Sequence, residues 1–128
     1  MKAQQRPISP FMIGPYYRLQ LTSVMSITHR ATGVLLSLLG APLLLWWIIA
    51  ISNGPESYSL LLSFLGSWVG KLGLLACLFS LSFHLFNGIR HLIWDTGRAL
   101  ELKSAYALGW LVLAATAVLT GALAGVLL

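Results

Sequence analysis

Residues 31–52, ATGVLLSLLGAPLLLWWIIAIS, form an apolar run without a single charged side chain. A helix needs ~20 apolar residues to cross the ~30 Å hydrocarbon layer of a bilayer. The run is therefore long enough to span a membrane. Residues 72–89 and 105–128 are also free of charge, and the first of these continues as an expected helix to about residue 94. The sequence thus predicts three transmembrane helices and an all-α fold.

The composition agrees with lipid as the main solvent. Of the 128 residues, 58% are hydrophobic and 9% are charged, whereas soluble domains carry roughly 25% charged residues. The net charge of +5 comes from scattered basic residues, so it indicates membrane orientation and not nucleic-acid binding. The single cysteine, Cys77, excludes an intramolecular disulfide and a multi-cysteine metal site.

Polar breaks separate the three runs. SNGPES at 52–57 carries a turn signal, and DTGRALELKS at 95–104 carries both signs of charge. The serine-interrupted residues 57–70 are expected to form a short interfacial piece or an extension of the second helix. We expect one transmembrane domain over residues 23–128, with spans near 24–52, 67–94 and 105–128.

The N-terminal stretch differs from the rest. Residues 1–17, MKAQQRPISPFMIGPYY, lack the apolar segment of a signal peptide and do not have the pattern of a transit peptide. Its prolines at 7, 10 and 15 argue against a regular helix. Residues 1–22 are therefore expected to form an extended or interfacial arm, and the lack of a transit peptide favours a bacterial inner membrane.

Basic residues are distributed unevenly around the expected spans. They precede the first span, flank the second connection, and are sparse at the first connection: Lys2, Arg6, Arg18 and Arg30; Arg90, Arg98 and Lys103; and Lys71 alone. Because cytoplasmic loops carry an excess of Lys and Arg, the N-terminus and the 95–104 loop are expected to face the cytoplasm. The C-terminus is expected on the opposite side.

A first cluster of polar residues lies where the first span begins, in SITHRATG at 26–33. Ser26, His29 and Arg30 are spaced i, i+3 and i+4, and Gly33 follows at i+7. On a helix these residues are expected to share one face. An arginine entering a bilayer costs ~3 kcal/mol on insertion scales, so this face is expected to meet something other than lipid.

A second cluster closes the second span, in HLFNGIRHLIWD at 84–95. His84, Gly88, His91 and Asp95 are spaced for one helical face. If the helix leaves the hydrocarbon near Asp95, His91 lies ~6 Å inside and His84 ~16 Å inside, at 1.5 Å per residue. A neutral imidazole at mid-membrane suits metal ligation. Gly88 leaves a gap where a flat macrocycle could lie, and cations near the interface could pair with its acidic groups.

Other interpretations of these residues remain open at this point. A histidine in a span often only hydrogen-bonds a neighbouring helix. Arg30 and Arg90 could simply be basic residues at a membrane boundary, and Asp95 could balance a loop charge. The pairing of Ser26 with His29 has no acidic third member, which argues against a nucleophilic triad.

Three motifs together resemble a known family. RPISP at 6–10, SITHRATG at 26–33 and HLFNGIRHLIWD at 84–95 match R-P-x-S-P, S-x-x-H-R-x-[ST]-G and H-x-x-x-G-x-R-H-x-x-x-D. In this order and spacing they resemble the cytochrome b556 membrane-anchor subunit of succinate dehydrogenase, over essentially the whole chain. The sequence departs from the family pattern at Phe11, where many members carry a histidine.

The resemblance implies a four-subunit enzyme in which this chain is not catalytic by itself. A flavoprotein subunit oxidises succinate, an iron–sulfur subunit relays electrons, and a second membrane-anchor subunit completes a shared haem-binding helical bundle. By resemblance, His84 is one axial ligand of a haem b and the second anchor supplies the other. His29, Arg30 and His91 are implied haem-propionate partners, and Ser26 and Arg30 are implied ubiquinone-binding residues.

Two other functions are compatible with the same residues. The same helices could anchor a fumarate reductase, with electron flow reversed. A different class is a small transporter subunit that uses His84 and Arg30 as a proton or anion path.

Overall fold

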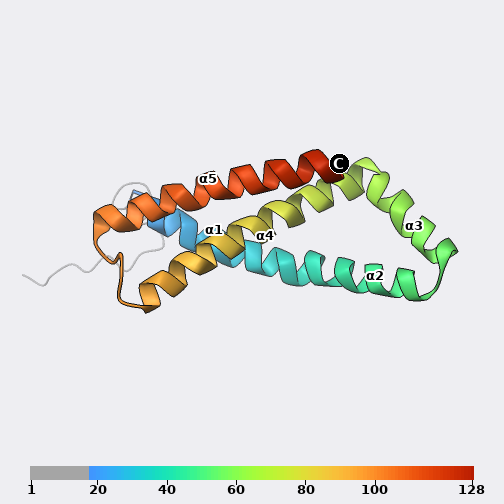
Figure 1. Cartoon of the computed structure of the whole chain (residues 1–128), viewed down its shortest axis with the longest axis horizontal. Coiled ribbons are helices and arrows are strands. Elements are labelled where there is room, and N and C mark those ends of the chain that lie inside the picture. The colour runs from blue at the N-terminus through green and yellow to red at the C-terminus, as the bar shows by residue number, and fades with distance from the viewer. Residues whose placement is uncertain (1–17) are drawn as a thin grey trace, which may run out of the picture.

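The computed structural model describes residues 18–128, which form helices and no strand (Figure 1). The expected all-α class is therefore confirmed. The motif at 6–10, and most of the predicted arm, lie outside the described residues. In chain order the elements are α1 (Leu21–Leu35), the π-helix η2 (Leu36–Gly40), α2 (Ala41–Ser52), α3 (Pro55–Gly66), α4 (Trp68–Asp95) and α5 (Leu102–Leu127).

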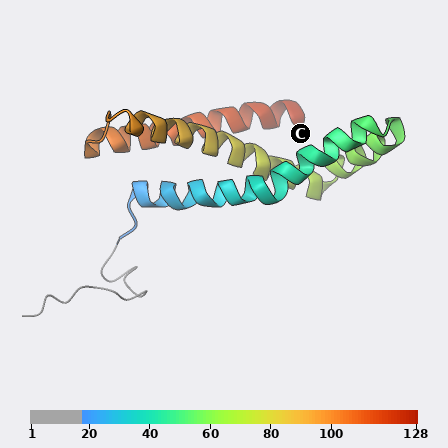
Figure 2. The ribbon, with the colours of Figure 1, turned by 90° about the horizontal axis from the view of Figure 1, so that it is seen from below.

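The elements α1, η2 and α2 form one continuous span, Leu21–Ser52. Pro42 lies in the first turn of α2 and has no amide hydrogen, so the turn before it cannot close an ordinary α-helical bond there. The helix forms a wider π-helical turn instead, in which the Ala41 amide donates a hydrogen bond to the Leu36 carbonyl oxygen, five residues back. π-helical turns of this kind bend helices, and Figure 2 shows the span changing direction where η2 joins α2.

The stretch between the first two spans forms a separate helix, α3, which packs back against α2 and does not extend α4. The corner at Ser67 is tight. Ser67 Oγ accepts a hydrogen bond from the Gly70 amide at 3.1 Å, a typical helix N-cap. A Cβ on Gly70 would overlap the Phe64 carbonyl oxygen and lie 2.6 Å from Leu65 Cα. Only glycine fits this corner without moving the backbone.

The helices α1, α4 and α5 meet at one end of the molecule. Their shared core consists of Met25, Phe83 and Val112. A Cβ on Gly109 would lie 3.0 Å from Met25 Sδ and 3.0 Å from Leu21 Cδ2. The missing side chain therefore lets α5 approach α1 closely.

The chain runs along the long axis of the molecule three times. The start of α1 and the connection between α4 and α5 lie at one end, and the C-terminus lies near the start of α4 (Figure 1). At this second end Lys71 Nζ donates to the Leu128 carbonyl oxygen at 3.0 Å. The α2–α3 hairpin projects beyond the C-terminal end of α5. Three long apolar helices, Leu21–Ser52, Trp68–Asp95 and Leu102–Leu127, confirm the three predicted spans.

The spans bury little of their surface within this chain. In their most apolar windows only 6%, 22% and 11% of residues are buried, in chain order. Large apolar side chains such as Leu38, Trp110 and Val118 are exposed. Lipid or other protein chains must cover these faces, because water cannot solvate so much apolar surface without a large cost.

Candidate functional site: a histidine cluster between two helices

All three histidines meet where α1 crosses α4. The ring centroids of His29 and His84 are 3.9 Å apart and nearly parallel, with an interplanar angle of 12°. His29 lies 5.1 Å from His91. Two sequence clusters separated by more than fifty residues thus form one site, within the helices that are apolar enough to span.

The imidazole of His84 is held by the backbone of α1. Its Nδ1 lies 3.1 Å from the His29 carbonyl oxygen and 3.3 Å from Thr32 Oγ1. A carbonyl oxygen can only accept, so Nδ1 carries the proton and donates it. In the neutral ring Nε2 then keeps its lone pair. This arrangement is typical of histidines that bind metals, where the other ring nitrogen donates to a carbonyl or carboxylate.

His91 is held in a similar way within its own helix. Its Nδ1 donates to the Asn87 carbonyl oxygen at 2.8 Å, and its ring makes an edge contact with Trp94 at 5.3 Å. Ring orientation alone therefore does not separate His84 from His91. Their depth does, because α4 ends at Asp95. At 1.5 Å per residue, His91 lies ~6 Å and His84 ~16 Å from that end.

The prediction that the residues of the first cluster share one helix face is only partly correct. His29 and Gly33 face α4, while Arg30 is exposed. Side chains of successive helical residues point ~100° apart. Because His29 faces α4, the side chain of Arg30, the next residue, points away from α4. A Cβ on Gly33 would lie 3.1 Å from His84 Cε1, so the space at this glycine accommodates the His84 imidazole.

Two further features suit a bound polar or planar group. His29 Nδ1 is buried and has no hydrogen-bond partner among the described residues. Such an unsatisfied group carries a penalty of ~1–3 kcal/mol, which an acidic group bound beside it would relieve. A Cβ on Gly88 would meet nothing within 4 Å, so the space expected at this position is open. These observations fit a haem with its propionates near His29.

Ser26 lines a cavity of about 320 Å³ near the start of α1. Three hydroxyl residues, an arginine, a histidine and a tryptophan line it: Thr22, Ser23, Ser26, Arg90, His91 and Trp94. The cavity thus brings the predicted quinone residue Ser26 beside His91. It can offer hydrogen-bond donors to a carbonyl-bearing ligand.

Arg90 has a role that the sequence did not reveal. A place at the membrane boundary was one interpretation of this residue, but only 2% of its surface is exposed. Its guanidinium donates to the Ala105 carbonyl oxygen at 3.0 Å and to Asn87 Oδ1 at 3.4 Å, and it lies 4.0 Å from the centre of the Trp94 ring. Arg90 therefore joins the start of α5 to α4. Helical periodicity could not show this, because it does not say which face α5 covers.

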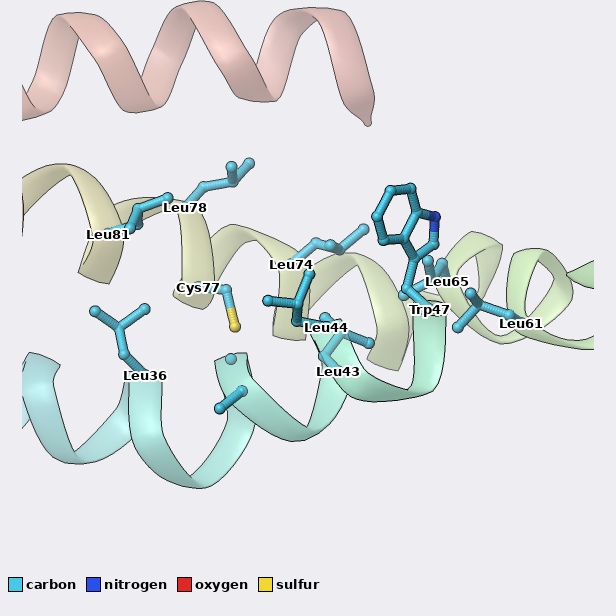
Figure 3. A pocket seen from close by; sticks show the side chains of 12 residues that line it. Leu36, Leu43, Leu44, Trp47, Leu61, Leu65, Leu74, Cys77, Leu78 and Leu81 are labelled. Atoms are coloured by element: carbon cyan, nitrogen blue, oxygen red, sulfur yellow. The ribbon is translucent and has the colours of Figure 1, made fainter. Parts of the chain in front are cut away.

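A groove of about 550 Å³ lies between α2, α3 and α4 (Figure 3). It lies away from the histidines, beside the first half of α4. Its lining is apolar and includes Trp47, Leu74 and the thiol of Cys77. It offers no charged group or amide to orient a polar ligand, so the candidate site is the histidine cluster.

Replacing Arg90 by alanine should loosen the start of α5. Charge-assisted hydrogen bonds of this kind each contribute ~1.5–3 kcal/mol, and the Ala105 carbonyl would lose its donor. We expect faster tryptic cleavage at the exposed Arg98 and Lys103 in membranes. Leu92→Ala, on the exposed face of α4, is the control. Equal cleavage rates in the two variants would contradict this role.

Comparisons with known proteins agree with these observations. Residues 2–123 match the family described as "Succinate dehydrogenase/Fumarate reductase transmembrane subunit". The succinate dehydrogenase cytochrome b556 subunit of Rickettsia felis is 38% identical over 116 residues, covering 91% of this chain and 88% of the relative. The corresponding subunit of Paracoccus denitrificans is 34% identical, covering 89% and 85%. The cytochrome b560 subunit of Reclinomonas americana is 37% identical, covering 84% and 76%.

The family match covers the first two spans and the third as far as residue 123, and the relatives are similar over most of their own length. The resemblance carried by the three sequence motifs is thereby confirmed. This chain belongs to the family of succinate dehydrogenase and fumarate reductase transmembrane subunits.

Proposed function

We propose that this chain is the cytochrome b membrane anchor of a succinate dehydrogenase, and that His84 ligates its haem b. The relatives named above are all succinate dehydrogenase cytochrome subunits. This favours succinate dehydrogenase over the two alternatives, a fumarate reductase anchor and a transporter subunit. The observation that carries the haem assignment is the depth of His84, which lies ~16 Å from the end of α4 at 1.5 Å per residue. The hydrogen bond of its Nδ1 leaves Nε2 available there.

The chain offers one half of a haem site. His84 would hold the iron, and His29, Arg30 and His91 would contact the propionates. The rings of His29 and His84 stack directly on each other at 3.9 Å, which leaves no space for a macrocycle between them. The second axial ligand would therefore come from a second anchor subunit. The haem, when bound, supplies a one-electron relay within the membrane.

Ubiquinone would bind beside the same end of α1. Ser26 supplies a hydroxyl donor from the cavity wall. Arg30, exposed at the next turn, supplies a positive charge that favours negative charge developing on a quinone oxygen. Because the cavity lies near the end of the helices, protons can reach a bound quinone from water.

The proposed setting follows from the same assignment. A flavoprotein subunit and an iron–sulfur subunit would dock at the end of the molecule that holds the Ser26 cavity and the connection between α4 and α5. The second anchor subunit would cover exposed faces of the spans. We place the complex in a bacterial inner membrane, with this end facing the cytoplasm, as the Lys and Arg distribution indicates.

The haem assignment predicts different spectra for two leucine variants. His84→Leu should lose the low-spin b-type α-band in dithionite-reduced membranes, because the iron loses an axial ligand. His91→Leu should keep the band while binding haem less tightly. Leu85→Ala, on the exposed face of α4, should match the parent. The reverse pattern, with the band lost only in His91→Leu, would refute the assignment.

The quinone assignment predicts a selective loss of activity in Ser26→Ala and Arg30→Leu. Losing one donor at an oxyanion-type site costs ~10²–10³ in rate, and we expect less because other subunits share the contact. Quinone reduction should fall, while succinate oxidation by a soluble flavin-level dye stays at the parental rate.

Thr28→Val provides the matched control, since Thr28 lies on α1 but does not line the cavity. All variants should be compared at equal haem content. Parental rates and parental quinone affinity in both Ser26→Ala and Arg30→Leu would show that these residues are structural.

The orientation predicts which loops are reached from outside the cell. Glu56 in α3 and Leu100 in the connection between α4 and α5 are exposed, and these two segments lie at opposite ends of the molecule (Figure 1). In a Cys77→Ala background, Glu56→Cys should react with an impermeant maleimide on intact cells. Leu100→Cys should react only after the membrane is permeabilised. Labelling of Leu100→Cys alone on intact cells would reverse the topology.

A further inference from the structure

We infer that Thr32 and Gly33 of α1 form a socket that positions the imidazole of His84, and that the Thr32 hydroxyl thereby tunes a haem bound through that ring. Neither residue would contact the iron. Both would act through His84, so the inference rests on the proposed role of His84 as a ligand.

The Thr32 hydroxyl is buried at the contact between the two helices, with 5% of the residue exposed. It donates to the His29 carbonyl oxygen at 2.9 Å. A threonine that bonds back to its own helix is common. Here the same carbonyl also accepts the proton of His84 Nδ1, and the hydroxyl oxygen lies 3.3 Å from that nitrogen. The hydroxyl proton is engaged with the carbonyl, so its oxygen is free to act as a second acceptor for Nδ1–H.

Gly33 forms the adjoining wall of the socket. A Cβ built on it would lie 3.1 Å from His84 Cε1 and 3.6 Å from His84 Nδ1. A separation of 3.1 Å is shorter than ordinary van der Waals contact, so a methyl group would push the ring away from α1. The hydrogen bonds on Nδ1 pull the ring in the opposite direction. The position of the imidazole is thus set by both residues.

The ring of His29 completes the enclosure. It stacks on one face of His84 at a centroid distance of 3.9 Å. The carbonyl and hydroxyl hold the Nδ1 edge, Gly33 receives the Cε1 corner, and His29 covers a face. Nε2 makes no hydrogen bond to the described residues, and this is the atom that a metal would take.

Acceptors on the far nitrogen make a metal-bound imidazole more electron-rich. An electron-rich ligand favours ferric over ferrous iron. Thr32→Val preserves the branched shape but removes one acceptor, so the midpoint potential of the haem should rise. Thr32→Ser retains the hydroxyl, so it should restore the parental value.

The test uses the assembled membrane complex and redox titration of the haem α-band. Thr116→Val is the matched control: Thr116 is also buried in a span, but its hydroxyl bonds only to the Val112 carbonyl of its own helix. A raised potential in Thr32→Val, with parental values in Thr32→Ser and Thr116→Val, supports the inference. A parental potential in Thr32→Val, or the same shift in Thr32→Ser, overturns it.

Gly33→Ala tests the other wall by a different measurement. Displacing the ring should weaken its bond to iron, so a larger fraction of reduced haem should bind carbon monoxide than in the parent. Gly121→Ala is the control, because a Cβ there would meet nothing within 4 Å. Equal carbon monoxide binding in the two variants would overturn the steric part of the inference.

The His84→Leu variant distinguishes a failure of the proposed haem ligand from a failure of the Thr32–Gly33 socket. If this variant retains a parental low-spin spectrum, His84 is not the ligand and the proposed function fails. If it loses that spectrum while the Thr32 and Gly33 variants behave like their controls, His84 is the ligand and only the socket is wrong.

Discussion

The hydrogen bond from His84 Nδ1 to the His29 carbonyl joins α1 to α4 at the depth where the polar side chains of the spans gather. Within hydrocarbon, a polar side chain must find its partner in protein, because lipid offers none. This bond satisfies an imidazole and fixes how two helices cross. Through that crossing it sets the place of His29 and His91, and the closeness of Gly33 to the ring. The rest of the candidate site is arranged around it.

Packing is unequal along the molecule. At the end that holds the α4–α5 connection, the core of Met25, Phe83 and Val112 lies beside the buried guanidinium of Arg90. At the other end, α2 and α3 enclose an apolar groove and project beyond α5. The polar and apolar contacts that hold α1, α4 and α5 together therefore lie at the same end of the molecule as the candidate site. A site built on the most constrained part of a fold can hold its groups in fixed geometry.

The sequence predicted the spans well because length and absence of charge are sufficient physical signals for a membrane helix. The functional roles of the two histidine clusters came from the family motifs and not from spacing alone, and they stay predictions. The sequence did not predict that Arg90 is buried against Ala105 or that Gly33 makes room for His84. Both facts depend on which helix faces which, and periodicity defines a face without naming its partner. Thr32 was part of the quoted motif, yet its contact with His84 spans two helices.

One polar atom of the histidine cluster has no partner among residues 18–128: His29 Nδ1 is buried and makes no hydrogen bond. A self-contained three-helix bundle would be expected to pair such atoms or to replace them by apolar side chains. The spans, moreover, leave most of their surface uncovered. Incomplete polar pairing and incomplete burial both support the proposal that a cofactor and a further set of helices complete the site. In that proposal the chain is one half of a shared haem-binding bundle, and α1 already orients its proposed ligand, His84.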